Sequence, residues 1–242
     1  MLAKLPTIAA GGVCALALVS LAACQVPPQS ATPVVAPPAP SVMTETGAPP
    51  AGALAYAIDP ARSVVTVVVR RDGPLARFGH DHVITSADER GTVWLGAVPA
   101  DSAFVVSLPI DRFEVDLPAA RVAAGPEFST PVPEEARAGT RQNLLRPAVL
   151  DAASWPEITL RSSAASGDWP QAAVQVAVSL KGVERIQTVP VSVTHDATSV
   201  VARGALTLRQ SDFGITPFSV AGGAIQVADA LEVSFVIAAV RR

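Results

Sequence analysis

Hydrophobic residues alternate with polar or small residues along most of the second half of the chain. The alternation is clearest over residues 173–180, 206–208 and 231–237. Successive side chains of a β-strand point to opposite faces, so a period of two predicts strands with one dry face. The residues on that face are Val174, Val176, Val178, Leu180, Leu206, Leu208, Val233, Phe235 and Ile237. We expect these side chains to face a common interior.

Short turn signals separate these strands, among them Gly167-Asp168 and Gly222-Gly223. Short turns join antiparallel neighbours, and about eight such strands can close into a barrel that leaves no exposed edge. The sequence therefore predicts an all-β fold built on an eight-stranded antiparallel β-barrel.

The first half of the predicted domain is less regular. Strands are predicted over residues 56–60, 63–71 and 103–110. Residues 80–95 are predicted to form one long strand, or a hairpin with a bulge near residues 88–91.

A proline-rich stretch and a helical segment follow this first half. Residues 114–133 carry several prolines and are predicted to form a loop. Residues 134–145 are predicted to be the one helical segment that packs against the barrel. Acidic residues occupy the first turn of this segment and Pro147 follows its end.

The N-terminus has the pattern of an export signal. Lys4 precedes an apolar stretch, residues 8–22, that is too short to span a bilayer comfortably. The stretch ends in Leu21-Ala22-Ala23-Cys24, which resembles the lipobox of bacterial lipoproteins. We therefore expect residues 1–23 to be a lipoprotein signal peptide and Cys24 to be acylated. The mature protein would be anchored to a membrane of a bacterial cell envelope, facing the periplasm; an ordinary secretory signal is the alternative.

Residues 24–53 are rich in proline. The prolines are Pro27, Pro28, Pro33, Pro37, Pro38, Pro40, Pro49 and Pro50. Proline fixes φ and removes a hydrogen-bond donor, so this region is predicted to be a disordered, semi-extended tether. A proline-rich recognition segment is the alternative, although the region lacks basic flanking residues. Residues 54–242 then form the barrel domain, and they contain no cysteine for a disulfide or a thiolate site.

Charge and motifs argue against several classes of function. The chain has 18 lysines and arginines and 21 aspartates and glutamates, which gives a formal net charge of −3. It has no basic stripe of the kind that binds nucleic acid. It also has no Gly-x-Ser-x-Gly elbow, no His-Glu-x-x-His sequence and no glycine-rich phosphate or dinucleotide motif. We therefore expect a non-enzymatic protein without a nucleic-acid partner.

Several segments together resemble the YceI-like family of lipid- or polyisoprenoid-binding proteins. The segments are Tyr56-Ala57-Ile58-Asp59, Leu150-Asp151-Ala152 with Trp155-Pro156-Glu157-Ile158-Thr159-Leu160, Leu180-Lys181-Gly182-Val183, and Ser211-Asp212-Phe213-Gly214-Ile215. They occur in order over residues 56–240. The resemblance implies an extended, lipocalin-like barrel with a helix against it, and an apolar lumen that can hold a long isoprenoid chain.

The nine dry-face residues are the candidates for lining this lumen. Aliphatic side chains with few aromatic rings suit a flexible hydrocarbon better than a flat ring system. We therefore expect a carrier or sequestering protein for an apolar lipid or isoprenoid-like ligand. An eight-stranded barrel can also be filled by its own side chains, which would favour a purely structural envelope lipoprotein. Some relatives of this fold associate as dimers, so the resemblance leaves a homodimer open.

The segment Gly79-His80-Asp81-His82 departs from the plain strand entry of the family and resembles a variant within the same fold. Residues two apart on a strand share a face, so His80 and His82 are expected to point the same way. Two imidazoles can ligate zinc, copper or haem iron, which makes a metal- or haem-associated envelope protein the alternative function. The other interpretation needs no cofactor: the histidines brace the barrel mouth, with an ion pair between Arg77 and Asp81.

Overall fold

The computed structural model describes residues 49–242, which include all of the predicted barrel domain. The predicted signal peptide (residues 1–23), the predicted acylation site Cys24 and the predicted tether up to residue 48 lie outside the described residues. The expectations about export and anchoring therefore stay predictions.

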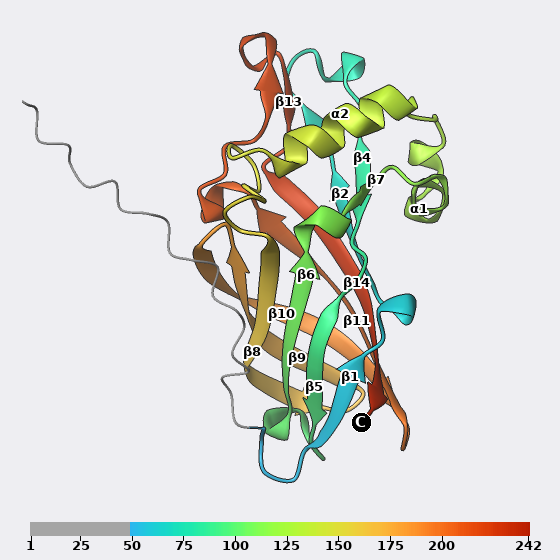
Figure 1. Ribbon diagram of the computed structural model, residues 1–242, viewed down its shortest axis with the longest axis vertical. Coiled ribbons are helices and arrows are strands. Elements are labelled where there is room, and N and C mark those ends of the chain that lie inside the picture. Colours follow the sequence, from blue (N-terminus) through green and yellow to red (C-terminus); the bar gives the residue numbers. More distant parts are fainter. Residues whose placement is uncertain (1–48) are drawn as a thin grey trace, which may run out of the picture. The chain divides into compact units, whose positions relative to one another are not determined.

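Eight antiparallel strands form a closed barrel (Figure 1). In order around the barrel they are β1 (Leu54–Ile58), β5 (Arg90–Leu95), β6 (Ala103–Pro109), β8 (Glu157–Asp168), β9 (Gln171–Leu180), β10 (Val183–His195), β11 (Ser199–Arg209) and β14 (Ala230–Arg241). β14 closes the circuit by pairing with β1, so that Tyr56 lies opposite Arg241 and Ile58 opposite Ala239. The predicted eight-stranded antiparallel barrel is confirmed.

β14 pairs with two strands along one edge. Residues 232–236 pair with β2 (Val64–Val69), and residues 239–241 pair with β1. Between β1 and β2 the chain turns, and the Ser63 hydroxyl accepts the N–H of Ala238 at 3.0 Å. The same hydroxyl donates to the carbonyl of Asp59 at 2.8 Å. Ser63 therefore bridges the gap between β1 and β2 in the ladder along β14.

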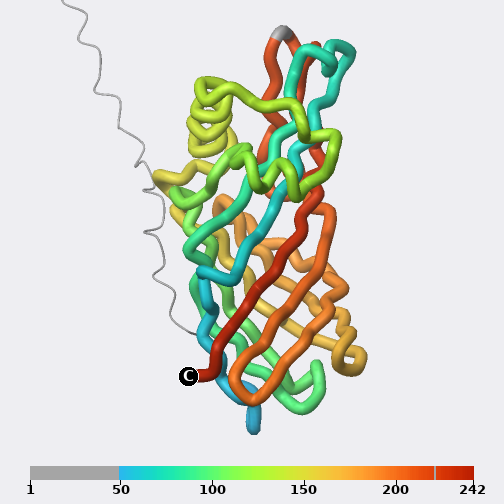
Figure 2. The backbone as a smooth tube through the Cα atoms, turned by 90° about the vertical axis from the view of Figure 1, so that its right-hand side faces the viewer, coloured from blue at the N-terminus to red at the C-terminus, as the bar shows by residue number. Residues whose placement is uncertain are grey.

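β2 begins an extension of the barrel wall at one end of the molecule. It pairs with β4 (His82–Thr85), which pairs with β7 (Glu114–Val115). A separate small sheet at the same end contains β12 (Ser219–Val220), β13 (Ile225–Val227) and β3 (Arg71–Asp72). Figure 2 shows the two hairpins that carry this sheet standing side by side beyond the barrel, although they are far apart in sequence.

Residues 80–95 form neither the long strand nor the hairpin that the sequence predicts. β4 pairs with β2, whereas β5 pairs with β1, and residues 86–89 connect them. In this connection the Ser86 hydroxyl accepts the N–H of Val65 at 3.0 Å and donates to the Glu89 carboxylate, while Asp88 has a φ of 61°. The prediction is wrong because β4 belongs to the extension and β5 to the closed barrel.

Two α-helices lie at the end of the barrel that carries the extension (Figure 1). α2 (Glu134–Leu145) has the predicted bounds, and its Leu144 and Leu145 pack against the core. α1 (Pro118–Ala124) lies within residues 114–133, where the loop prediction is therefore wrong. Proline is compatible with the first turn of a helix, where no N–H is needed, and the alanines that follow Pro118 favour helix. Within residues 49–242, no helix is long and apolar enough to cross a membrane.

Short 3₁₀ segments join many of these elements. They are η1 (Pro60–Arg62), η2 (Ala76–Phe78), η3 (Pro99–Asp101), η4 (Ile110–Arg112), η5 (Pro126–Phe128), η6 (Ser211–Phe213) and η7 (Ala221–Gly223). Ile110, Phe128 and Phe213 are buried at these junctions. The junctions therefore carry part of the core that the strands do not supply.

Candidate ligand-binding cavity

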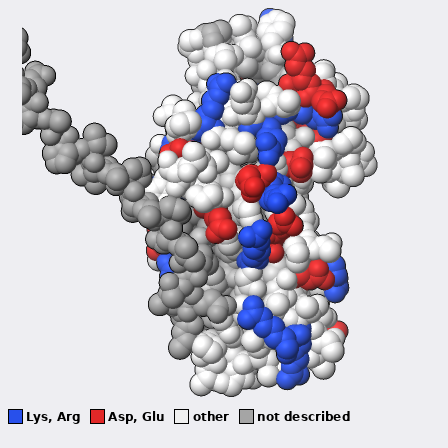
Figure 3. Space-filling view, in the orientation of Figure 1, with Lys and Arg blue, Asp and Glu red and all other residues white. Residues whose placement is uncertain are grey.

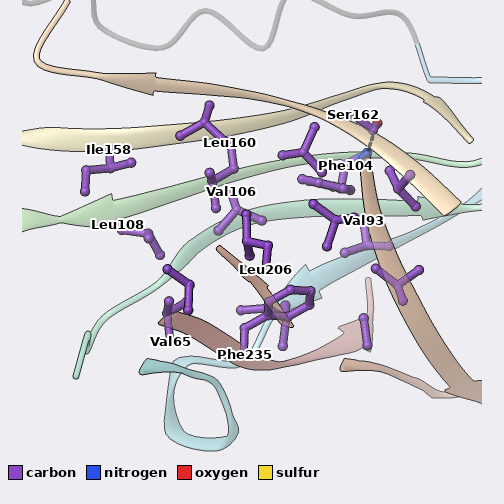
Figure 4. A pocket seen from close by; sticks show the side chains of 18 of the residues that line it. Val65, Val93, Phe104, Val106, Leu108, Ile158, Leu160, Ser162, Leu206 and Phe235 are labelled. Carbon is purple, nitrogen blue, oxygen red and sulfur yellow. Dashed lines mark hydrogen bonds between the residues drawn. The ribbon is translucent and has the colours of Figure 1, made fainter. Parts of the chain in front are cut away.

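The barrel encloses a cavity of about 220 Å³. Its lining is dominated by valine, leucine and isoleucine from the inward faces of the strands, with Phe104, Phe113, Phe235 and Trp169 as the aromatic members. Figure 4 shows side chains from facing walls, among them Leu160 on β8 and Phe235 on β14, pointing into the same space. All nine residues of the predicted dry face line this cavity: Val174, Val176, Val178, Leu180, Leu206, Leu208, Val233, Phe235 and Ile237.

Small side chains explain why the barrel is not filled. An eight-stranded barrel is just wide enough for side chains to fill it or to leave one small cavity. Several inward positions here carry alanine or serine instead of a large apolar residue. They are Ala103 on β6, Ser162 and Ala165 on β8, Ala202 on β11 and Ala239 on β14. The missing side-chain volume at these positions leaves open space between the valines and leucines.

The polar atoms of the lining are already bonded to the protein. The Ser162 hydroxyl accepts the N–H of Phe104 at 2.9 Å, as Figure 4 also shows. The Ser102 hydroxyl accepts the N–H of Gly96 at 2.9 Å, and the indole of Trp169 donates to the Gly96 carbonyl at 3.3 Å. Ser86 is held by Val65 and Glu89. The lining therefore presents hydrocarbon to a ligand and keeps its hydrogen-bonding groups occupied.

A buried ionic network lies outside the cavity, between β4 and α1. The carboxylate of Asp116 is 0% exposed and lies 2.7 Å from Nη1 of Arg121 and 2.6 Å from Nδ1 of His82. It also accepts the backbone N–H of Val83 at 2.9 Å. Arg121 donates in addition to the carbonyls of Asp81, Phe128 and Thr130. The network thus ties the loop around α1 to the extension of the barrel wall.

The pKa of Asp116 lies below its ordinary value of 3.8. Burial alone raises this pKa, because a carboxylate loses its hydration. The hydrogen bonds from His82, Val83 and Arg121 act in the opposite direction and outweigh burial. The carboxylate therefore stays ionised in the interior and holds its three partners.

The two histidines do not share a strand face as predicted. β4 begins at His82, so His80 lies outside the strand, exposed, with its ring centroid 6.4 Å from that of His82. The prediction is wrong because the regular strand begins two residues later than the sequence indicates. In the part of the chain that the structure describes, no three histidine, cysteine, aspartate or glutamate residues are grouped to hold a metal ion. A metal site at His80 and His82 stays a prediction, and it would have only the two imidazoles as protein ligands.

The predicted ion pair between Arg77 and Asp81 does not form. Asp81 lies 3.7 Å from the guanidinium of Arg70 and 3.6 Å from that of Arg71, and it accepts the backbone N–H of Arg71 at 2.9 Å. The Arg77 guanidinium lies over the ring of Phe78, 4.6 Å from its centroid. The arginines of the neighbouring strand end reach Asp81 because β2 and β4 are paired.

Sequence reasoning missed the Asp116–Arg121 pair and the polar group around Glu89. Asp116 and Arg121 lie in the segment predicted as a loop, where charged residues are ordinarily solvated. Glu89 is 1% exposed, yet it occurs in the polar run Asp88-Glu89-Arg90, which indicates a surface turn. The only local signal was Pro118 followed by alanines, which marks the start of α1 and with it the position of Arg121.

The closed antiparallel barrel and its hydrocarbon-lined cavity define a small-barrel protein of lipocalin-like architecture. The YceI-like domain family matches residues 56–239, and the chain belongs to this family. This confirms the family that the sequence motifs indicate.

Two solved structures show the same fold. Burkholderia cenocepacia BcnA has 17% sequence identity and a TM-score of 0.56, covering 75% of this chain and 98% of its own. A domain from Saccharophagus degradans, described as a polyisoprenoid binding domain implicated in plant cell wall breakdown, has 12% identity and a TM-score of 0.54, covering 78% and 99%. A comparison with curated proteins gave no match.

Proposed function

We propose that the barrel binds an apolar, chain-like lipid of the isoprenoid type and carries or sequesters it without catalysing a reaction. The observation that carries the proposal is the hydrocarbon-lined cavity, whose few polar atoms are bonded to the protein. A ligand in this cavity contacts hydrocarbon, so binding is driven by the removal of apolar surface from water. Sequence motifs for enzymatic chemistry are missing, which supports a binding role.

The cavity volume limits how much of a ligand it can hold. An engineered cavity of about 150 Å³ binds benzene, and the cavity here measures about 220 Å³. It therefore has room for a short hydrocarbon segment. We infer that the cavity holds one segment of an isoprenoid chain, and that a longer chain would extend beyond it.

Family membership and one structural neighbour support the choice of ligand. The Saccharophagus degradans domain is described as polyisoprenoid-binding. Its identity to this chain is 12%, so the likeness supports only the barrel fold. The choice of ligand therefore rests on the residues that line the cavity. Those residues are mostly branched aliphatics, which pack well against the branched units of an isoprenoid.

The location in the cell envelope is part of the proposal. The sequence around Cys24 supports acylation at that cysteine, and more than one acyl chain gives stable membrane anchoring. Metabolic labelling with a fatty-acid analogue tests this directly: the wild-type chain is labelled and a Cys24→Ala chain is not. Label that persists in Cys24→Ala, or is missing from the wild type, contradicts the anchor.

Lipid extraction and native mass spectrometry test the ligand proposal. The full chain would be expressed with its own signal and compared with two variants on the same strand, Ala202→Leu and Ala205→Leu. Ala202 lines the cavity, whereas Ala205 is exposed on the outer face of β11. Leucine at position 202 adds three carbon atoms that take up part of the cavity, and leucine at position 205 leaves the cavity unchanged.

We expect the wild type and Ala205→Leu to co-purify with an apolar lipid and Ala202→Leu to lose it. Filling an empty apolar cavity commonly stabilises a protein by about 0.5–2 kcal/mol, so Ala202→Leu should keep or raise the Tm. A wild type that carries no apolar lipid after repeated extraction overturns the proposal. Equal lipid content in both variants places the lipid outside this cavity.

A further inference from the structure

The end of the molecule that carries β3, β12 and β13 exposes four large apolar side chains. They are Leu75 (37% exposed), Phe78 (63%), Phe218 (40%) and Val220 (44%). Leu75 and Phe78 belong to the hairpin around η2, and Phe218 and Val220 to the hairpin that carries β12 and β13. We call these four residues the apolar tip. Figures 1 and 2 show the two hairpins standing together beyond the barrel.

The two hairpins hold each other in place. β13 pairs with β3, so that Gln226 lies opposite Asp72 and Val227 opposite Arg71. The N–H of Leu75 donates to the Ala224 carbonyl at 2.8 Å, and the N–H of Val227 donates to the Phe218 carbonyl at 2.9 Å. The apolar side chains are therefore exposed on an ordered, hydrogen-bonded platform and not on a frayed loop.

The platform has few charges, and an arginine borders its apolar side chains. Residues 214–228 contain no lysine, arginine, aspartate or glutamate. In Figure 3 the surface over β13 is correspondingly white, apart from one residue that is not described. Arg77 lies over the ring of Phe78, and among the described residues it makes no ion pair. The Asp72 carboxylate is engaged by the N–H of Gly73 at 2.7 Å and by the Gln226 amide at 3.3 Å.

We propose that the apolar tip is a membrane-docking surface and that its partner is a lipid bilayer with anionic headgroups. Exposed apolar residues on an ordered platform mark a contact surface for a membrane or another protein. The phenylalanine rings beside an unpaired guanidinium favour the bilayer, because phenylalanine buries at the boundary between headgroups and acyl chains and arginine reaches the phosphates. The uncharged hairpin of residues 214–228 can enter the headgroup region without the cost of desolvating a charge.

The chain outside the described residues allows this contact. β1, which begins at Leu54, starts at the end of the barrel opposite the apolar tip (Figure 1). β14, with 12 residues, spans about 40 Å at roughly 3.3 Å per residue. Roughly 25 proline-rich residues from Cys24 to Pro49 reach at most about 80 Å. Under the proposed acylation at Cys24, the anchor and the apolar tip can therefore contact the same bilayer.

Docking does not depend on the ligand proposed for the cavity. The two proposals have separate measurements, since lipid extraction reports the cavity and hydrogen exchange reports the apolar tip. If both proposals hold, docking of the apolar tip brings the barrel into contact with the bilayer, from which an apolar ligand would enter the cavity.

Hydrogen exchange on the full chain, anchored in vesicles, tests the docking surface. The vesicles contain about 70% phosphatidylcholine and about 30% phosphatidylglycerol. The comparison uses the wild type, Phe78→Ser/Phe218→Ser, and the control Ile186→Ser. Ile186 on β10 is 60% exposed, close to the exposure of Phe78, and belongs to neither hairpin of the apolar tip. We expect amides of residues 221–224 to exchange about tenfold more slowly in the wild type and in Ile186→Ser than in the double variant.

A second variant and an internal reporter keep the test decisive. The amide of Val227 is bonded to Phe218 within the hairpin, so slow exchange there in the double variant shows that the hairpin is still folded. Arg77→Glu keeps the apolar side chains, and we expect it to lose protection on anionic vesicles but not on pure phosphatidylcholine. Equal exchange in all proteins overturns the proposal. Protection that disappears when the anchored protein is diluted in the vesicles also overturns it, because a second copy would then cover the apolar tip.

Discussion

Phe235 and Gly204 lie directly opposite each other on β14 and β11, and the ring of Phe235 covers the glycine. A Cβ atom at Gly204 would lie 2.6 Å from Cζ of Phe235 and 2.7 Å from the carbonyl oxygen of Pro190. Both distances are shorter than any ordinary contact. The absence of a side chain at position 204 therefore lets an aromatic ring lie against the barrel wall, where it takes least space from the cavity.

We predict that Gly204→Ala destabilises the protein. The new methyl group has to displace the Phe235 ring into the cavity and push against the backbone of β10, and overpacking of this kind costs about 1–3 kcal/mol. The free energy of unfolding, measured by denaturant titration of the full chain, checks the prediction. Gly139→Ala is the control: this glycine lies in α2 with nothing within 4 Å of the added Cβ. Its replacement should stabilise by about 0.5–1 kcal/mol, and a Gly204→Ala as stable as wild type would contradict the packing described.

We predict a large loss of stability for Arg121→Met. The substitution leaves the buried Asp116 carboxylate without its cation, and breaking a buried ion pair from one side costs about 3–5 kcal/mol. Arg203→Met is the matched control, because Arg203 is exposed on β11 and surface substitutions usually stay within about 0.5 kcal/mol. Thermal or denaturant unfolding checks both variants. If the two arginines proved equivalent, the network would not hold the α1 segment to β4.

The lowered pKa of Asp116 predicts how stability depends on pH. Its folded-state pKa lies below the unfolded value, so its contribution is fully present above the unfolded pKa and is lost as pH falls through the folded pKa. Asp116→Asn should therefore be less stable than wild type at pH 7, and the difference should shrink below about pH 4. Free energies of unfolding across this range provide the measurement. A difference that stays constant down to pH 2.5, where roughly all ordinary carboxylates are protonated, would show that Asp116 is not the titrating group.

The two histidines are predicted to behave differently. His82→Ala removes a hydrogen bond to a buried charge, which costs about 1.5–3 kcal/mol, whereas His80 is exposed and His80→Ala should have little effect on stability. Elemental analysis of the purified protein, run beside the unfolding measurements, covers the alternative function. Stoichiometric zinc, copper or iron that both substitutions abolish would favour a shared metal site over bracing by His82.

Much of the barrel could be predicted because its second half follows a local rule. Val174 to Leu180 and Leu231 to Ile237 alternate strictly, so the face that lines the cavity is determined by neighbours in sequence. α2 could also be predicted from local features, because acidic residues occupy its first turn and a proline follows its end. The same rule could not decide that the cavity stays open, because its volume depends on small residues contributed by four separate strands.

The errors fall where the structure depends on distant partners. Residues 82–85 and 90–95 are adjacent in sequence but join different neighbours, because β14 accepts β2 along one part and β1 along another. The start of β4 at His82 is set by pairing with Val69, which no local pattern around Gly79 reports. Asp116 and Arg121 are interior only because α1 packs against β4. The sequence gives no local signal of this burial, because charged residues in a proline-rich stretch are ordinarily expected at the surface.

The double pairing of β14 has a consequence for biosynthesis. β1, β2 and β11 all hydrogen-bond to β14, so the ring of strands cannot close until residues 230–241 have been made. A nascent chain that lacks β14 therefore cannot form the closed barrel. The pairings of β14 with β1 and β2 join residues far apart in sequence, and such contacts form slowly. The barrel therefore stays open during translation until β14 has been synthesised and has paired with β1, β2 and β11.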